Sequence, residues 1–311
     1  MDVIQGSRSL TTPLRAPVVA IGNFDGVHVG HRRLLELARE RARQLGGQSV
    51  ALSFDPHPAK VLAPRLAPPL ICTPERKREL IAACGIDVLC LEPFDTHTAA
   101  QSADAFVATT LVGALGAREI VVGYDFTYGK GRSGNTQTLA AAGGEHGFAV
   151  SVVPQVTVHG LVASSTKIRE LLHEGNVAGA RLLLGRDFDV DGTVVRGAGR
   201  GRDLGFPTAN VAVANELLPR PGIYATRVSV GGGPWGAAAT SLGTNPTFGA
   251  GALALEAHLL DFSGDLYGQS VRVAFVAWLR GEERFASVEA LIEQIGADVV
   301  HTREALAEEP A

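Results

Sequence analysis

The chain has 311 residues, which is too long for one ordinary hydrophobic core and enough for two domains. Its 46% hydrophobic and 19% charged residues are typical of a globular protein and exclude disordered and fibrous classes. A net charge of -4 does not favour nucleic acid or anionic membrane, and three cysteines without CxxC spacing predict reduced thiols instead of disulfides or a zinc ribbon.

The N-terminal segment, MDVIQGSRSLTTPLRAP, lacks the apolar core of a signal peptide. No apolar run approaches the roughly 18 residues of a membrane-spanning helix. We therefore expect a cytoplasmic protein.

The first half of the chain alternates between strands and helices. An apolar strand over 17–22 precedes a helix over about 31–45, whose leucines and alanines share one face. Further strands are predicted over 49–54, 86–91, 118–122 and 148–153, and further helices over 74–84, 101–115, 135–147 and 166–184. This alternation predicts a Rossmann-like parallel sheet covered by helices, and we assign residues 1–185 to that domain.

The second half of the chain has a different sequence pattern. After Gly185, short β-rich runs are separated by Gly and Pro, which favours a small antiparallel β-barrel or sandwich. The runs are FDVDGTVV, GIYATRVSV, GAAATSLG, LALEAHLL and SVRVAFVAWL. A helix over about 287–306 ends this domain, which we assign to residues 186–311.

The run GNFDGVHVGH (Gly22–His31) lies between the first predicted strand and its helix. Its glycines let a ligand approach the backbone, and His28 and His31 flank a helix start, where free N–H groups attract phosphate. Two imidazole donors there suit a transferring phosphoryl group. A metal site is a weaker alternative because no third ligand is near, and ordinary loop histidines are the other alternative.

Two glycine-rich stretches fail known fingerprints. GYDFTYGKG (Gly123–Gly131) resembles a P-loop, but Lys130 is followed by Gly131 instead of Ser or Thr. GAGRGRDLG (Gly197–Gly205) does not match the dinucleotide pattern GxGxxG.

The second domain opens with DGTVVRGAGRGRDLGFPTANV (Asp191–Val211), a loop rich in Gly and Arg that is able to cradle phosphate. We interpret PTAN as a polar turn in which Thr208 and Asn210 offer neutral oxygens to Mg²⁺. A basic loop that touches RNA is the alternative, and the acidic net charge and lack of interleaved aromatic residues count against it.

These motifs carry a family resemblance. The HxGH element resembles the nucleotidyltransferase superfamily, and the longer string GNFDGVHVGH is similar to the form in prokaryotic bifunctional riboflavin kinase/FAD synthetases. The strings SFDPHP, GYDFTYGKGRSG and SSTKIRELL match that family in the same order, and DGTVVRGAGRGRDLGFPTANV resembles its riboflavin kinase signature. The resemblance continues through GIYATRV, SLGTNPTFG, LEAHLLDFSGDLYG and WLRGEERF, so it covers nearly the whole chain.

For the first domain the resemblance implies an ATP site and a flavin site. His28 and His31 would stabilise the ATP phosphates, together with Ser165, Thr166 and Arg169, where two hydroxyls at a helix start and an Arg one turn later also suit phosphate. The other expected ATP contacts are Gly22, Asn23, Phe24, Asp25 and Gly30. The expected flavin contacts are Asp55, His57, Asp125, Phe126, Tyr128 and Arg132, with Asp125 at a position that is often Asn in similar sequences.

For the second domain the resemblance implies that Glu256 is the general base that takes the proton of the ribityl hydroxyl. Glu256 and His258 share one face of a predicted strand, although an exposed strand carboxylate is the commoner role for such a Glu. Thr208 and Asn210 would bind Mg²⁺ and ATP phosphate. Gly197, Arg200 and Arg202 would contact phosphate, and Asn245 and Arg280 would contact flavin.

The implied function is the synthesis of flavin cofactors. Riboflavin and ATP would give FMN and ADP in the second domain, FMN and ATP would give FAD and pyrophosphate in the first, and both steps would need Mg²⁺. The expected partners are therefore ATP, riboflavin, FMN and FAD, with no nucleic acid, no membrane and at most weak self-association. Two rival hypotheses are an enzyme with a single activity and a non-enzymatic nucleotide-sensing or RNA-binding protein.

Overall fold

A computed structural model of the chain describes residues 1–197, 201, 204–244 and 253–307. It divides into two compact units. Unit 1 comprises Met1–Pro69 and Pro74–Ser164, and unit 2 comprises Leu70–Thr73 and Ser165–Ala311. The domain boundary near residue 185 stays a prediction, because a division by contacts need not follow the modules of the sequence.

Unit 1 is built on a sheet of six parallel strands, in the order β1-β4-β3-β2-β5-β8. The parallel sheet predicted from the sequence is thus confirmed. Its strands are β1 (Asp2–Gln5), β2 (Val18–Ile21), β3 (Ser49–Asp55), β4 (Val88–Pro93), β5 (Glu119–Gly123) and β8 (Ala149–Val153). Strand β1 was not predicted, because DVIQ is largely exposed at the sheet edge and carries no apolar run.

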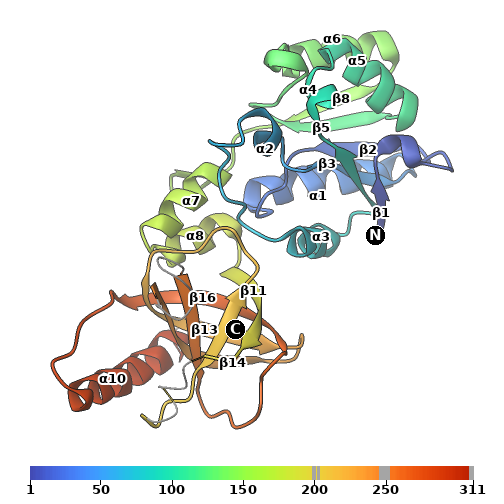
Figure 1. Cartoon of the computed structure of the whole chain (residues 1–311). Helices are drawn as coiled ribbons and strands as arrows, with labels where there is room; N and C mark the ends of the chain where they lie inside the picture. The colour runs from blue at the N-terminus through green and yellow to red at the C-terminus, as the bar shows by residue number, and fades with distance from the viewer. Residues whose placement is uncertain (198–200, 202–203, 245–252, 308–311) are drawn as a thin grey trace. The chain divides into compact units, whose positions relative to one another are not determined.

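Helices cover both faces of this sheet (Figure 1). Helices α1 (Val29–Gln44) and α3 (Pro74–Ala83) pack on one face through residues such as Leu35 and Ile81. On the other face the predicted helix over 101–115 is a short α-helix, α5 (Ala103–Phe106), that continues as a π-helix, η2 (Val107–Ala114), beside α6 (Thr136–His146). The shorter elements of unit 1 are η1 (Ser7–Ser9), α2 (Pro58–Leu62), α4 (Thr96–Ala99), β6 (Thr127–Tyr128), η3 (Lys130–Arg132), β7 (Gly134–Asn135), β9 (Thr157–Val158) and β10 (Leu161–Val162).

The strand order reverses between β2 and β5. The chain runs outward from β2 through β3 to β4 on one side, and from β5 to β8 on the other. In open parallel sheets, ligands bind outside the carboxyl ends of the strands at such a reversal. The motifs GNFDGVHVGH and GYDFTYGKG directly follow β2 and β5, so both lie at this point of the sheet.

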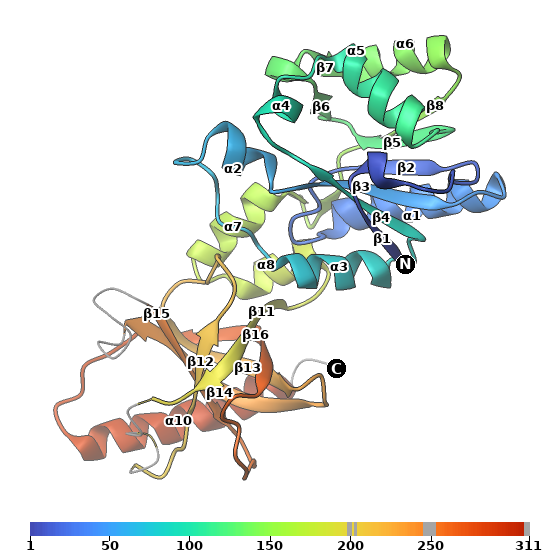
Figure 2. The same cartoon turned by 45° about the vertical axis from the view of Figure 1, so that its right-hand side comes forward.

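Unit 2 contains a closed antiparallel barrel of six strands, in the order β11-β12-β15-β14-β13-β16 (Figure 2). Its strands are β11 (Phe188–Val195), β12 (Ala209–Val213), β13 (Gly222–Val230), β14 (Trp235–Thr244), β15 (Leu253–Leu259) and β16 (Ser270–Arg280). The terminal helix α10 (Val288–Ala307) packs against β13, β14 and β16. The predicted small barrel with a C-terminal helix is therefore confirmed.

Two local predictions for unit 2 were wrong. The single helix over 166–184 is two helices, α7 (Ser165–His173) and α8 (Val177–Leu184). The break occurs because Gly175 adopts a φ of 81° and the Asn176 side chain accepts a hydrogen bond from Gly179 N at 2.8 Å, which starts a new helix.

The PTAN segment is also more regular than the polar turn that we predicted. Ala209 and Asn210 already belong to strand β12, and Asn210 lies directly opposite Glu256 of β15 in the antiparallel register. The barrel thus places the two side chains on neighbouring strands.

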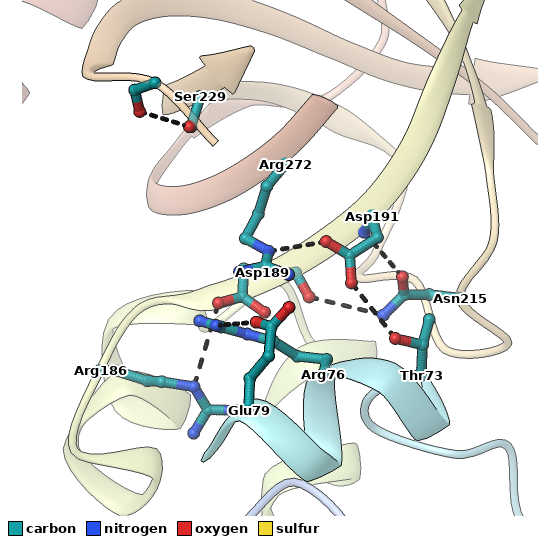
Figure 3. Close-up of polar contacts among 10 residues, drawn as sticks. Thr73, Arg76, Glu79, Arg186, Asp189, Asp191, Asn215, Ser229 and Arg272 are labelled. Atoms are coloured by element: carbon teal, nitrogen blue, oxygen red, sulfur yellow. Dashed lines mark hydrogen bonds and ion pairs between the residues drawn. The ribbon is translucent and has the colours of Figure 1, made fainter. Parts of the chain in front are cut away.

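A polar cluster in unit 2 surrounds Asp191 of β11 (Figure 3). Arg272 Nε donates to Asp191 Oδ1 at 2.6 Å, and Thr73 Oγ1 donates to Asp191 Oδ2 at 3.2 Å. Asp191 N in turn donates to Asn215 Oδ1 at 2.8 Å. These bonds hold the segment that ends at Thr73 to the barrel strand.

Within the ranges that the structure describes, every helix is too short or too polar to cross a lipid bilayer.

Candidate active sites in the two units

The loop between β2 and α1 has an unusual backbone. Phe24, Gly26 and Val27 have φ values of 51°, 75° and 41°, in the left-handed region that residues other than Gly rarely adopt. Phe24 and Val27 are fully buried in the core beneath α1, which anchors the loop despite this strain. Non-glycine residues in this region cluster at functional sites.

His28 forms the N-cap of α1. Its Nδ1 atom accepts a hydrogen bond from His31 N at 3.2 Å. An acceptor at Nδ1 requires the proton of the neutral ring to be on Nε2, so Nε2 is a donor. The ring is only 6% exposed.

His31 stacks on His28, with ring centroids 3.6 Å apart. Burial lowers the pKa of His31 well below its ordinary value, and the neighbouring His28 and Lys77 lower it further. His31 Nδ1 is buried and has no hydrogen-bond partner among the described residues. The helix start therefore presents two stacked imidazoles, of which His31 is held neutral and has an unsatisfied ring nitrogen.

Close contacts explain the glycines around these histidines. A Cβ atom at Gly30 would lie 3.1 Å from His28 Cε1 and 3.5 Å from the Ala163 carbonyl oxygen. A Cβ atom at Gly22 would lie 3.0 Å from the Phe24 ring. Any side chain at either position would displace an aromatic ring of the loop.

A cavity of about 600 Å³ opens where the strand order reverses. Gly22 and Asn23 border it from the loop after β2, while Asp125, Phe126, Tyr128 and Arg132 border it from the segment after β5. Phe54, Phe94 and Phe106 add three more aromatic rings to the wall, beside those of Phe126 and Tyr128. A wide aromatic wall with a few polar groups suits a flat, mostly apolar ring system.

The predicted flavin residues are thus partly brought together. Four of the six expected in unit 1 line this cavity, and Phe126 stacks on Tyr128 with centroids 5.5 Å apart. From the SFDPHP segment, Pro58 lines the wall, whereas the His57 ring caps α2 by accepting from Ala59 N at 3.2 Å. The flavin contacts of Asp55 and His57 stay predictions.

Ser165, Thr166 and Arg169 form the first turns of α7 in unit 2. Thr166 is exposed, and the other two residues are half-buried. Their participation in the same phosphate site as His28 and His31 stays a prediction.

A second cavity, of about 410 Å³, lies in unit 2 beside the barrel and α10. Thr208, Asn210 and Glu256 line it together with Arg280. Arg200, Arg202 and Asn245 lie outside the described residues.

Asn210 has the properties of a cation or phosphate ligand. Its side chain is 7% exposed, and its Oδ1 atom is buried without a hydrogen-bond partner among the described residues. A buried orphan oxygen is costly unless a ligand satisfies it. Together with the Thr208 hydroxyl it fits Mg²⁺, which takes a few protein oxygens when phosphates supply the remaining charge.

Gly197 closes over this amide. A Cβ atom built on Gly197 would overlap the side chain of Asn210, so only Gly lets the loop approach that closely. Glu256 approaches from the opposite strand with its side chain half-buried. A carboxylate, a hydroxyl and an amide oxygen therefore meet in one cavity, as a general base and a metal site for phosphoryl transfer require.

Arg280 pairs with the buried Asp298 of α10. Its Nη2 and Nε atoms donate to the two carboxylate oxygens at 2.7 and 2.9 Å. This bidentate contact fastens the end of β16 to α10, and Asp298 lines the cavity as well. Flavin binding by Arg280 stays a prediction.

His258 lines the barrel cavity although it was not among the predicted site residues. Its Nδ1 atom donates to the Pro207 carbonyl oxygen at 2.8 Å, and its ring contacts Phe206 edge-on at 5.5 Å. The sequence did carry a signal, because His258 is two residues from Glu256 on the same strand face.

A parallel-sheet unit with imidazoles at a helix start, together with a barrel unit whose cavity is lined by a carboxylate and an unsatisfied amide oxygen, is typical of a nucleotide-using transferase. The family model of FAD synthetase matches residues 11–167, and that of riboflavin kinase matches residues 184–306. The chain belongs to the family of bifunctional riboflavin kinase/FMN adenylyltransferases.

Similar proteins span nearly the full length. The bifunctional riboflavin kinase/FMN adenylyltransferase of Pseudomonas fluorescens is 40% identical over 97% of this chain and 97% of its own. That of Escherichia coli K12 is 39% identical over 98% of this chain and 97% of its own. The crystal structure of a macrolide-efflux protein from Streptococcus pneumoniae superposes with a TM-score of 0.88 at 31% identity, over 97% of this chain and 99% of that one.

Proposed function

We propose that the chain converts riboflavin to FMN at the barrel cavity and FMN to FAD in unit 1, with ATP as co-substrate of both steps. The observation that carries this proposal is that each unit has a cavity lined by residues of its own family motifs. We assign the kinase to residues 186–311 and the adenylyltransferase to residues 1–185.

In the kinase step the ribityl 5′-hydroxyl of riboflavin attacks the γ-phosphorus of ATP. Glu256 accepts the hydroxyl proton, a new P–O bond forms, and ADP leaves with the electron pair of the broken bond. Phosphoryl transfer depends mostly on positioning and charge stabilisation, so Glu256 needs only an ordinary carboxylate basicity.

Thr208 and Asn210 would hold Mg²⁺ in this site. The ion would neutralise phosphate charge during the transfer. The orphan Asn210 Oδ1 supports this assignment, and Gly197 supports it by keeping room for the amide.

In the adenylyl step a phosphate oxygen of FMN attacks the α-phosphorus of ATP, and pyrophosphate leaves. His28 Nε2–H and the free N–H groups of the first turn of α1 would donate to the phosphate chain. His31 stays neutral and offers its unsatisfied ring nitrogen. By the family resemblance, Ser165, Thr166 and Arg169 would also bind ATP phosphate, and Mg²⁺ would be needed for this step too.

The aromatic cavity at the end of β5 would take the isoalloxazine ring of FMN between side chains such as Phe126 and Phe54. We also propose that the enzyme works in the cytoplasm, which fits three cysteines that form no disulfide.

A flavin assay tests the proposal. The purified protein is incubated with riboflavin, ATP and Mg²⁺, and the flavins are separated by chromatography over time. We expect FMN to appear first and FAD to follow, with ADP and pyrophosphate as co-products. FMN without FAD would indicate a single-activity kinase, and ATP binding without either product would indicate a nucleotide sensor.

A further inference from the structure

Lys77 of α3 brings a positive charge to the carboxyl edge of the sheet in unit 1. Its Nζ atom donates to Ser53 Oγ at 3.2 Å, at the end of β3. Ser53 Oγ in turn donates to the Asn23 carbonyl oxygen at 3.1 Å, in the loop that leads to the two histidines. This chain of contacts holds the lysine stem beside the loop.

The ammonium group is also close enough to His31 to act on it electrostatically. Lys77 is one of the groups that lower the pKa of His31, after burial and the neighbouring His28. Lys77 itself is half-buried. A lysine side chain therefore lies within electrostatic reach of the buried His31 ring, whose pKa is lowered.

This arrangement matches a need of the reaction that the histidines alone do not meet. When the α-phosphorus of ATP is attacked, negative charge builds up on the departing pyrophosphate. Neutral imidazoles and the N-terminus of α1 supply dipoles and partial charges, whereas a lysine ammonium supplies a whole charge in a fixed place.

We propose that Lys77 is a further catalytic residue of adenylyl transfer, which binds the ATP phosphates and stabilises the pyrophosphate leaving group. The bond between the α-phosphorus and the bridging oxygen breaks, its electron pair goes to the pyrophosphate, and Lys77 stays protonated as it donates to that group. This inference rests on the proposed adenylyltransferase function of unit 1.

The alternative role for Lys77 is structural, in which its only task is to hold Ser53 and the loop. Two substitutions separate the roles. Lys77→Met removes the charge and keeps the length of the side chain, whereas Ser53→Ala removes the hydrogen bond between the two residues and keeps the charge. Arg43→Ala is the matched control, because it removes an exposed cation from the last turn of α1.

The experiment measures kcat and KM for FAD formation from FMN, the reverse reaction of FAD with pyrophosphate, and riboflavin phosphorylation in the same preparations. For Lys77→Met we expect kcat to fall by about a hundredfold to a thousandfold in both directions of adenylyl transfer. Riboflavin phosphorylation should be unchanged, which shows that unit 2 is folded, and an unchanged far-UV circular dichroism spectrum and Tm show that unit 1 is folded. Ser53→Ala should lose far less than Lys77→Met, and Arg43→Ala should match the wild type.

Equal losses in Ser53→Ala and Lys77→Met would overturn the proposal, as would a Lys77→Met variant with wild-type FAD formation. If Lys77→Met does not fold, Lys77→Arg tests the proposal instead. Because Lys77→Arg displaces the charge, it should lower kcat for FAD formation while Tm and riboflavin phosphorylation stay the same. Full FAD formation by Lys77→Arg would contradict the proposal. A wild-type protein that makes no FAD would instead refute the proposed function itself.

Discussion

At the scale of single residues, two features of this protein follow from burial. His31, stacked on His28 at the start of α1, is kept neutral, and its Nδ1 atom is buried without a hydrogen-bond partner among the described residues. The Asn210 amide oxygen, next to Gly197, is buried in the same way. A buried polar atom without a partner lowers stability, and a polar ligand would remove that cost.

The neutral state of His31 makes the stability of the protein sensitive to acid. The pKa of His31 is lowered in the folded state, whereas an unfolded histidine titrates near pH 6.5. As the pH falls below about 6.5, the unfolded chain takes up a proton that the folded chain does not, so the folded state loses stability. Above that pH His31 has no such effect.

We therefore expect the free energy of unfolding to fall more steeply between about pH 7.5 and pH 5.5 in the wild type than in His31→Gln. Urea titrations of both proteins at the two pH values measure the difference. Because the other histidines are common to both proteins, parallel losses would show that His31 is not held neutral by the fold.

The glycine at 197 is the second residue-scale test. Gly197→Ala would push its Cβ atom into the Asn210 amide, so riboflavin phosphorylation should drop by at least about tenfold while FAD formation from supplied FMN persists. Gly296→Ala is the control, since no atom lies within 4 Å of its added Cβ in helix α10 and Ala favours helix by about 1 kcal/mol. Comparable kinase rates in the two variants would mean that Gly197 does not shape the site.

At the scale of the elements, α10 forms part of the wall of the barrel cavity and is fastened there by Arg280 and Asp298. The pair is bidentate, and Asp298 is only 4% exposed. Removing one partner of such an enclosed ion pair destabilises the protein, because the charge of the other partner stays buried without an opposite charge beside it.

Asp298→Asn should therefore lower the free energy of unfolding of unit 2 by about 2 kcal/mol. This loss is smaller than the one expected for a fully enclosed pair, because the Arg280 side chain keeps some contact with solvent. It should also raise KM for riboflavin. Asp261→Asn breaks the exposed pair with Arg303 and is the control, for which we expect no measurable change. Urea unfolding midpoints and kinase KM values of both variants measure these effects. An Asp298→Asn variant with the unfolding midpoint and KM of the wild type would show that other contacts hold α10.

The elements also show how far sequence reasoning reaches. Periodicity and turn residues were enough to predict the parallel sheet and the barrel, because long apolar patterns report burial directly. The break between α7 and α8 was missed although Gly175 and Asn176 are stop and start signals, since the apolar face continues across them. Strand β12 was missed because its five residues include Asn210, a polar residue that serves the site.

The site was predictable where its residues share a motif. His28 with His31, and Thr208 with Asn210, are close in sequence and need only one local structure each. Lys77 and Phe94 have no such neighbours. Lys77 meets Ser53 near the end of β3, and Phe94 borders the cavity at the ends of β2 and β5, so the fold alone brings them there. Contacts of this kind depend on topology, which no short string reveals.

At the scale of the whole molecule, the account requires two catalytic sites that work independently in one chain. The histidines belong to unit 1, and Glu256 belongs to unit 2. FMN made at the barrel must reach the other site, and nothing in the chemistry requires both sites to be on the same molecule.

A complementation assay tests this claim most directly. One protein carries His28→Ala with His31→Ala, the other carries Glu256→Ala, and each receives riboflavin, ATP and Mg²⁺ alone and as a mixture. We expect FMN but no FAD from the first protein, neither product from the second, and FAD only from the mixture. A folded variant that loses both activities, tested with FMN supplied as well, would contradict the account of two separate sites.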